Sequence, residues 1–298
     1  MSDQLPSFYE TEFATNWEMK VQQMDARLVS AVTPASFQGK RKWFNQLAVG
    51  TMTEVTDRKG VTPDGDTLGD KYWMYRRKFE FIRTWDEDDQ MELGSIALPD
   101  SDEISSFSAA ENRTKDAVII QAFDATRYIG ADGVTTNAFD SNFSIAVDFN
   151  ATGSPANCGL TVEKVLHAKK LMDTAEVPDG DRYFACSAQQ LQDMLLLAKA
   201  TSRDYVGMLT PLVDGTVDKF AGFNFRRTEQ LTRNTSTDVR TCFAWHKTGI
   251  KLAENGRDVH IDVLPTMRHA KQLRGVTRLS AVRTQNEAVV RVYCDESP

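Results

Sequence analysis

The sequence has few cysteines and histidines, and neither type is arranged as a site. The four cysteines stand far apart without a CxxC pair, and the four histidines are isolated. Cysteines spaced in this way are more often small buried apolar residues than disulfide partners or metal ligands. This usage is typical of a protein in a reducing compartment.

The sequence signatures of common enzymes are also missing. It has no GxGxxG after a strand, no phosphate-binding Walker loop, no GxSxG elbow and no HExxH. The acidic run at residues 86–89 lacks the alternating ligands and the glycine of a calcium loop. We therefore predict no catalytic, cofactor-binding or metal-binding residue and no enzyme activity; a cytosolic α+β enzyme remains as the least favoured alternative.

Long apolar runs and an excess of positive charge are absent as well. No run approaches the roughly 18 residues of a membrane span, and the N-terminus lacks the basic and apolar regions of a signal peptide. The net charge of −7 argues against a strongly basic nucleic-acid binder. The 298 residues, 41% of them hydrophobic, suffice for one large domain or two domains with a sizeable core.

The stretch Pro99–Gly130 is predicted to form one long helix. Its apolar residues recur at three- and four-residue steps, and Asp102 and Glu103 stand where the positive end of a helix dipole favours carboxylates. Such a helix would far exceed the average of about 11–12 residues and could support a broad molecule. Two shorter helices, broken near residues 105–108, are the alternative.

Residues 48–93 are predicted to form a long, charged hairpin. Two β-prone arms flank a centre rich in Gly, Pro and Asp, and both faces carry charge, so the ribbon would be marginal alone in water. It could lie on a copy of itself through opposite charges, remain a solvated hairpin, or touch nucleic acid through its basic and aromatic residues. The candidate contact residues are Arg58, Lys71, Arg76, Arg77 and Arg83 against Asp86, Glu87, Asp88 and Asp89.

Residues 7–33 are predicted to form a helical N-terminal arm that ends at Pro34. Phe8, Phe13 and Trp17 lie on a polar background. An amphipathic arm with little chain ahead of it can join the core or dock on another subunit. The three aromatic residues are therefore further candidate contacts between subunits.

The second half of the chain mixes helices and strands. We predict helices at residues 161–177 and 188–200, the first with Val162, Val165, Leu166, Lys169 and Met172 on one face. Strands are expected at residues 144–149, 182–187, 220–231, 239–253 and 260–266, and the run 277–296 is expected to finish with a strand that alternates over residues 289–294. Helix–strand alternation followed by a strand-rich tail is typical of a mixed α+β fold rather than a doubly wound sheet.

The order of these elements resembles a known family. An N-terminal arm, a charged hairpin and a long helix precede a domain that contains RYFACSAQQLQDMLL, DGTVDKFAGFNFRRTEQL and RLSAVRTQNEAVVRVYCDE. This order is similar to that of the major capsid proteins of tailed bacteriophages with the Hong Kong 97-type fold. The resemblance implies an arm at residues 1–47, an extended hairpin loop (E-loop) at 48–93, a peripheral domain with the spine helix at 94–150 and 255–298, and an axial domain at 151–254.

The resemblance also implies a function and partners. Copies would assemble, in the host bacterial cytoplasm, into an icosahedral shell of hexamers and pentamers around double-stranded DNA. A separate scaffolding protein and a portal are expected, with weak non-specific DNA contacts, a possible decoration protein, no cofactor and no membrane. Some relatives join subunits through Lys–Asn bonds, for which Lys59, Lys71 and Asn286 would be available, but a chain of this size offers such pairs by chance. An encapsulin-like nanocompartment shell is the second hypothesis.

Overall fold

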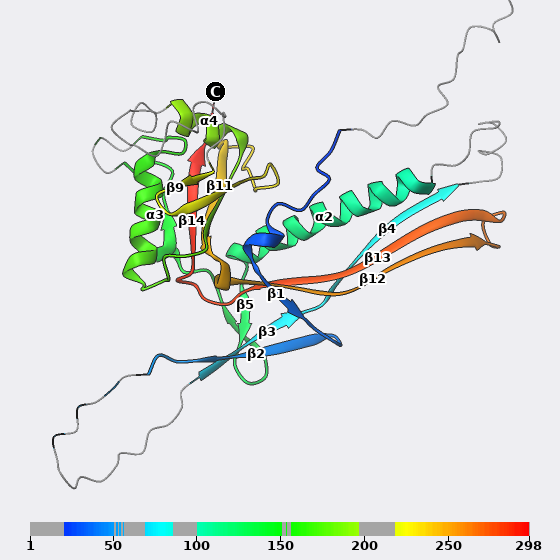
Figure 1. Cartoon of the computed structure of the whole chain (residues 1–298), viewed down its shortest axis with the longest axis horizontal. Coiled ribbons are helices and arrows are strands. Elements are labelled where there is room, and N and C mark those ends of the chain that lie inside the picture. Colours follow the sequence, from blue (N-terminus) through cyan, green and yellow to red (C-terminus); the bar gives the residue numbers. More distant parts are fainter. Residues whose placement is uncertain are drawn as a thin grey trace, which may run out of the picture. The chain divides into compact units, whose positions relative to one another are not determined.

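The computed structural model describes residues 21–50, 52, 54, 56, 69–85, 100–150, 153, 156–196 and 218–297. Within these ranges the chain forms three β-sheets and the helices α2, α3 and α4 (Figure 1). It divides into two compact units. The first unit comprises the described parts of residues 1–26, 78–114 and 256–277, and the second comprises those of residues 27–77, 115–255 and 278–298.

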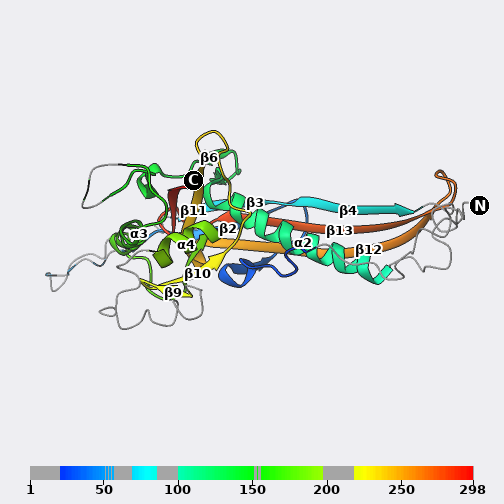
Figure 2. The same cartoon turned by 90° about the horizontal axis from the view of Figure 1, so that it is seen from above.

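The long strands β12, β13 and β4, which Figure 2 shows side by side, and the short strand β1 form a four-stranded sheet in the order β1-β12-β13-β4. The bounds are Thr33–Ser36 for β1, Ile250–Leu264 for β12, Ala270–Arg283 for β13 and Arg77–Trp85 for β4. β1 runs parallel to β12 and pairs only with residues 251–254 of it. Residues 239–266 were expected as two strands with a turn; β11 ends at His246 and β12 then continues unbroken to Leu264.

The hairpin forms a second four-stranded sheet in the order β2-β3-β5-β6. The bounds are Arg41–Leu47 for β2, Gly69–Tyr75 for β3, Arg127–Ile129 for β5 and Thr135–Asn137 for β6. The prediction that both arms lie within residues 48–93 is wrong: the first arm begins at Arg41, and β4 pairs with β13 instead of continuing the second arm. The backbone N–H of Arg76 donates to the carbonyl of Lys40 over 3.0 Å. The pairing of β2 with β3 ends at this point, and the chain then passes into β4 of the other sheet.

The remaining strands form a six-stranded sheet in the order β7-β14-β11-β8-β10-β9. The bounds are Ser144–Ile145 for β7, Val289–Asp295 for β14, Val239–His246 for β11, Arg182–Cys186 for β8, Phe223–Arg227 for β10 and Lys219–Phe220 for β9. Its helices are α3 (Val162–Thr174) and α4 (Ala188–Leu196). β14 comes from the predicted peripheral range, yet it pairs with β11, which lies in the predicted axial range.

The long predicted helix is present as α2 (Asp100–Asp124), unbroken at residues 105–108. It ends earlier than predicted, because residues 127–129 extend as β5 and pair with both β3 and β6. Ile129, which fits the helical spacing, packs instead against the core under the hairpin sheet. Long-range strand pairing therefore overrides the local helical pattern at this end.

The predicted helical arm is wrong for its described part, residues 21–33. This segment holds only the short 3₁₀ helix η2 (Val29–Ala31) before β1. The backbone N–H groups of Arg27 and Leu28 donate to the Asp116 carboxylate over 2.9 and 3.0 Å. A carboxylate on α2 thus satisfies donors that a helix would have used internally, and Leu28 is fully buried.

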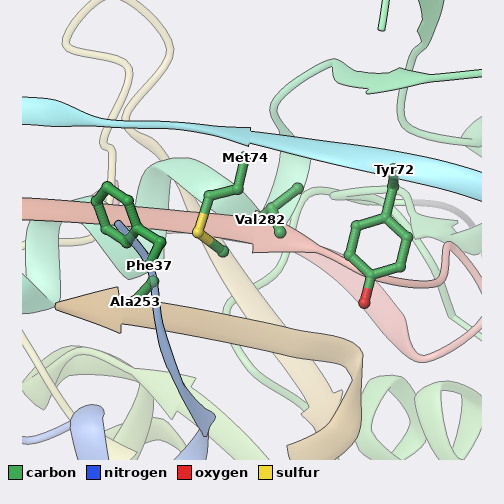
Figure 3. Packing of buried hydrophobic residues seen from close by; sticks show 5 residues of the cluster. All are labelled: Phe37, Tyr72, Met74, Ala253 and Val282. Atoms are coloured by element: carbon green, nitrogen blue, oxygen red, sulfur yellow. The ribbon is translucent and has the colours of Figure 1, made fainter. Parts of the chain in front are cut away.

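A compact apolar cluster lies under the hairpin sheet in the second unit. It consists of Phe37, Tyr72, Met74, Ala253 and Val282 (Figure 3). These residues come from β3, β12, β13 and the segment after β1, so the cluster packs the hairpin sheet against β12 and β13.

No helix in the described part of the chain is long and apolar enough to cross a membrane.

Candidate assembly surface

The hairpin sheet has one covered face and one open face. In β2 and β3, Phe44 pairs with Tyr72 and Lys42 with Met74, and this face packs on the apolar cluster. Side chains on a strand alternate between faces, so the partners Arg41, Trp43, Lys71, Trp73 and Tyr75 share the other one. Tyr128 joins them through its pairing with Trp73. We call Arg41, Trp43, Lys71, Trp73, Tyr75 and Tyr128 the open face.

Three aromatic side chains on the open face remain accessible. Trp43 is 49% exposed, Tyr128 42% and Tyr75 38%. Tyr75 and Tyr128 meet edge-to-face with ring centroids 5.1 Å apart. Aromatic groups bury 150–250 Å² each when covered, so this is apolar surface that a partner could cover.

The loop between β5 and β6 holds this face in place. The Trp73 indole N–H donates to the Gly130 carbonyl over 2.8 Å, and the Tyr75 hydroxyl donates to the Gly133 carbonyl over 3.1 Å. Gly133 has φ +69°, and a Cβ there would lie 2.8 Å from the Trp73 ring. Only glycine fits this approach, so the backbone closes directly over the indole.

Cations stand over the aromatic rings. The Lys71 ammonium lies 5.0 Å from the Trp43 ring centroid, and the Arg41 guanidinium lies 4.9 Å from that of Trp73. Within the described residues neither cation forms an ion pair with a carboxylate. The open face is therefore positive as well as aromatic, and suits an acidic partner.

The four predicted basic contacts that the structure describes are exposed but do not form one group. Lys71, Arg76 and Arg77 belong to the second unit, and Arg83 belongs to the first. Arg77 donates to the Gln121 side chain over 2.7 Å, and Arg83 lies 5.1 Å from the Phe81 ring. Only Lys71 is on the open face.

The other predicted contacts fall outside the described residues. They are Phe8, Phe13, Trp17, Arg58, Asp86, Glu87, Asp88 and Asp89. Sequence reasoning also missed Trp43 and Arg41, because it began the hairpin after them. Their alternation with Lys42 and Phe44 is a strand pattern that could have identified β2.

A polar cavity of about 270 Å³ lies at the base of the hairpin. Its lining residues are Thr33, Asn45, Gln46, Tyr72, Thr248, Lys251, Thr284 and Gln285. The Lys251 ammonium is 2.8 Å from the Tyr72 hydroxyl and 4.5 Å from the Phe44 ring centroid. The lining contains no carboxylate, histidine or cysteine.

The buried histidine and thiols have packing roles. Nδ1 of His246 is 2.7 Å from the Thr248 hydroxyl, and burial lowers the pKa of this imidazole. Of the four cysteines predicted to be buried, Cys186, Cys242 and Cys294 are buried, whereas Cys158 is half-buried. Burial raises the pKa of the Cys186 thiol. In the described part of the chain no group of three or more His, Cys, Asp or Glu residues is placed to hold a metal ion.

Comparison with known proteins gives a consistent result. The profile of the family described as phage capsid protein matches residues 5–296. The capsid structure of the cyanophage P-SCSP1u is similar with a TM-score of 0.73 at 15% identity, covering 96% of this chain and 93% of that one. A search of curated proteins gives no match.

Two further capsid structures resemble the chain over almost its whole length. That of Ralstonia phage GP4 has a TM-score of 0.69 at 8% identity and covers 97% of this chain and 96% of that one. The capsid asymmetric unit of cyanophage Pam1 has a TM-score of 0.68 at 12% identity and covers 99% of each chain. These likenesses confirm the predicted Hong Kong 97-like α+β fold. The match across nearly the entire sequence shows that the chain belongs to the phage capsid protein family and is a structural protein of the virion shell.

Proposed function

We propose that copies of this chain form a closed icosahedral shell of hexamers and pentamers around the double-stranded DNA of a tailed phage. The open face of the hairpin is the contact surface that we assign to assembly. The observation that supports it is the row of accessible aromatic rings and cations on the sheet face opposite the core. A sheet with one face on the core and such an exposed face on the other side gains most from a neighbouring copy that covers it.

The size of the contact follows from the exposed area. Trp43 is 49% exposed, so covering it removes roughly 100 Å² from water, or about 2–3 kcal/mol at ~25 cal/mol per Å². Ion pairs at an exposed rim add only about 0–1 kcal/mol each. Single contacts of this size are weak, and their repetition over a closed lattice makes the shell stable.

The acidic partner that we propose is the run Asp86, Glu87, Asp88 and Asp89 of a neighbouring copy. Arg58, Lys71, Arg76, Arg77 and Arg83 remain proposed contacts on the basic side. The assignments of arm, E-loop, peripheral domain and axial domain are part of the same proposal. So are assembly in the host cytoplasm, a separate scaffolding protein and portal, weak contact with packaged DNA, a decoration protein, and the lack of enzyme activity.

Particle mass tests the proposed surface. The double variant Trp43→Ala/Lys71→Glu removes the most exposed ring and reverses the charge above it. Leu166→Ala is the matched control, because Leu166 is also 49% exposed and lies in the same unit. Light scattering of purified protein should show large particles for the wild type and the control, and only small oligomers for the double variant with an unchanged circular dichroism spectrum. Assembly of the double variant at the wild-type concentration would refute the assignment.

A further inference from the structure

The polar cavity at the base of the hairpin holds an ammonium group without a counter-charge. Lys251 lines the cavity and is half-buried, and its ammonium donates to the Tyr72 hydroxyl over 2.8 Å. The same ammonium lies 4.5 Å from the centroid of the Phe44 ring. Within the part of the chain that the structure describes, Lys251 forms no ion pair. A cation that is partly withdrawn from water and has no carboxylate beside it is stabilised by an anion that enters the same cavity.

Lys251 and Tyr72 also provide the free hydrogen-bond donors of the lining. The hydroxyls of Thr33 and Thr284 already donate to backbone carbonyls, over 3.0 and 2.8 Å. The Lys251 ammonium has two N–H groups besides the one that it donates to Tyr72, and the Tyr72 hydroxyl, which accepts that bond, keeps its own proton. Three donors therefore remain for a ligand at the Lys251 end of the cavity.

The carboxylates nearest to this region act on a different cation. Asp70 pairs with Gln46 in the hairpin, but it does not line the cavity. Burial lowers the pKa of the Arg127 guanidinium, and Glu287 and Asp70 counter this effect. These two carboxylates thus balance Arg127, and the Lys251 charge has no carboxylate of its own among the described residues.

We propose that this cavity binds a carboxylate group, which the Lys251 ammonium and the Tyr72 hydroxyl hold. A carboxylate carries one negative charge and two oxygens that only accept hydrogen bonds, so it matches one ammonium and three free donors. A phosphate group carries about −1.5 to −2 and would leave excess negative charge beside a single ammonium. The cavity, at about 270 Å³, has room for the carboxylate and a short aliphatic chain.

The carboxylate has two possible sources, an Asp or Glu side chain of a neighbouring copy and a small carboxylic acid in solution. Phe44 and Tyr72, which contact Lys251, belong to the covered face of the hairpin sheet. The site is therefore separate from the open face that we assign to assembly, and the failure of either proposal leaves the other standing.

Acylation of Lys251 measures the binding on the unaltered protein. Peptide mass spectrometry follows the rate at which acetic anhydride modifies Lys251, with the exposed Lys219 as the internal control. Succinate at about ten times its dissociation constant should slow the modification of Lys251 about tenfold by mass action, and should leave Lys219 unchanged. Sodium chloride at the same ionic strength should slow neither lysine. Equal effects of the two salts on Lys251 would refute the carboxylate site.

The same measurement separates the two sources. If a neighbouring copy supplies the carboxylate, Lys251 should be protected in assembled particles without succinate and become reactive when the particles are dissociated. If a free acid is the ligand, Lys251 should react at the same rate in particles and in dissociated copies until succinate is added. A Lys251 that stays fully reactive in both forms with succinate present would refute the site.

Equilibrium dialysis against radiolabelled succinate tests the two donors and gives the dissociation constant. Dissociated wild-type chains should bind one succinate each. Lys251→Met should weaken this binding at least about tenfold and Tyr72→Phe about three- to tenfold, because each variant removes a hydrogen bond to a charged group. Lys219→Met is the matched control for the loss of one charge, since Lys219 is exposed in the same unit. Unchanged affinity in both Lys251→Met and Tyr72→Phe, with wild-type circular dichroism spectra, would refute the assignment.

Discussion

Lys164 gives the sharpest test of how this chain is held together. It lies on α3 and is fully buried, and the three N–H groups of its ammonium are shared among four backbone carbonyls: Val147 at 2.9 Å, Cys158 at 2.7 Å, Gly159 at 3.1 Å and Tyr293 at 2.9 Å. One cation therefore joins the segment before α3 to β14. We expect Lys164→Met, which keeps the length of the side chain, to destabilise the protein strongly.

The magnitude follows from the acceptors that lose their donor. The carbonyls of Val147 and Cys158 keep bonds from the N–H groups of Cys158 and Asp295, at 3.2 and 3.0 Å. A buried acceptor left unsatisfied costs about 1–3 kcal/mol, so the loss should come mainly from Gly159 and Tyr293. Relief of the desolvated charge offsets part of it. The expected net loss is about 2–4 kcal/mol.

Thermal unfolding followed by circular dichroism measures this loss. For a unit of this size, 1 kcal/mol shifts Tm by roughly 2–4 °C, so Tm should fall by roughly 4–16 °C. Lys170→Met, an exposed lysine on the same helix, is the control and should leave Tm almost unchanged. Equal Tm values for the two variants would show that the four carbonyls do not depend on the ammonium.

Three further results are expected. Burial lowers the pKa of His246 in the folded protein below its unfolded value near 6.5. The neutral imidazole therefore contributes its full share of the free energy of unfolding above pH 6.5, and this contribution falls as the pH drops below that value toward the folded pKa. Tm measured from pH 8 to pH 5.5 should decline less in His246→Gln than in the wild type, and parallel curves for the two proteins would contradict this. Gly133→Ala should cost about 1–3 kcal/mol in denaturant unfolding, since its Cβ would meet the Trp73 ring at 2.8 Å, and a neutral effect would contradict the close approach. Arg274→Ala should change stability by less than about 1 kcal/mol, because its 2.9 Å pair with Glu80 is solvent-exposed; a larger loss in the same assay would show that the pair is more than a surface contact.

Local sequence patterns predicted the helices and strands that are stabilised by interactions between residues close together in the sequence. The helix α2 follows from its apolar spacing, and α3 begins where Thr161 caps the N–H of Lys164. β8 follows from a continuous apolar run in a buried strand. In each case the residues that define the element lie within a few positions of one another.

Elements that depend on distant partners were predicted less well. The end of α2 was missed because β5 is fixed by β3, which lies more than fifty residues earlier in the chain. Residues 21–33 are not helical because Asp116 takes up their backbone donors. On α3 the sequence favoured Leu166 as a core residue, yet it is 49% exposed, while Lys164 is buried among carbonyls that no local pattern reveals.

The candidate assembly surface was likewise predicted only in part. Lys71 was predicted from charge alone, and its position over Trp43 depends on the register between β2 and β3. From charge alone, Arg76, Arg77 and Arg83 were predicted as contacts in the same way as Lys71. Of these four residues only Lys71 lies on the open face. A sequence can show that a hairpin is basic; the strand register decides which cations stand beside the rings.

The cations beside the aromatic rings of the open face affect how selective and how reversible the proposed contact is. A bare row of aromatic rings would bind any apolar surface, whereas the ammonium over Trp43 keeps that exposed ring next to a charge; the Trp73 ring beside Arg41 is already buried. A cation–π contact at an exposed site contributes about 0.5–1 kcal/mol, which is less than covering the ring would gain. A partner that supplies carboxylates can retain the cations and cover the rings at once, while an uncharged apolar partner must desolvate the cations without replacement. The face therefore favours an acidic partner over a merely apolar one, and the weak, specific contact that results is of the kind from which a regular lattice can correct its own errors during growth.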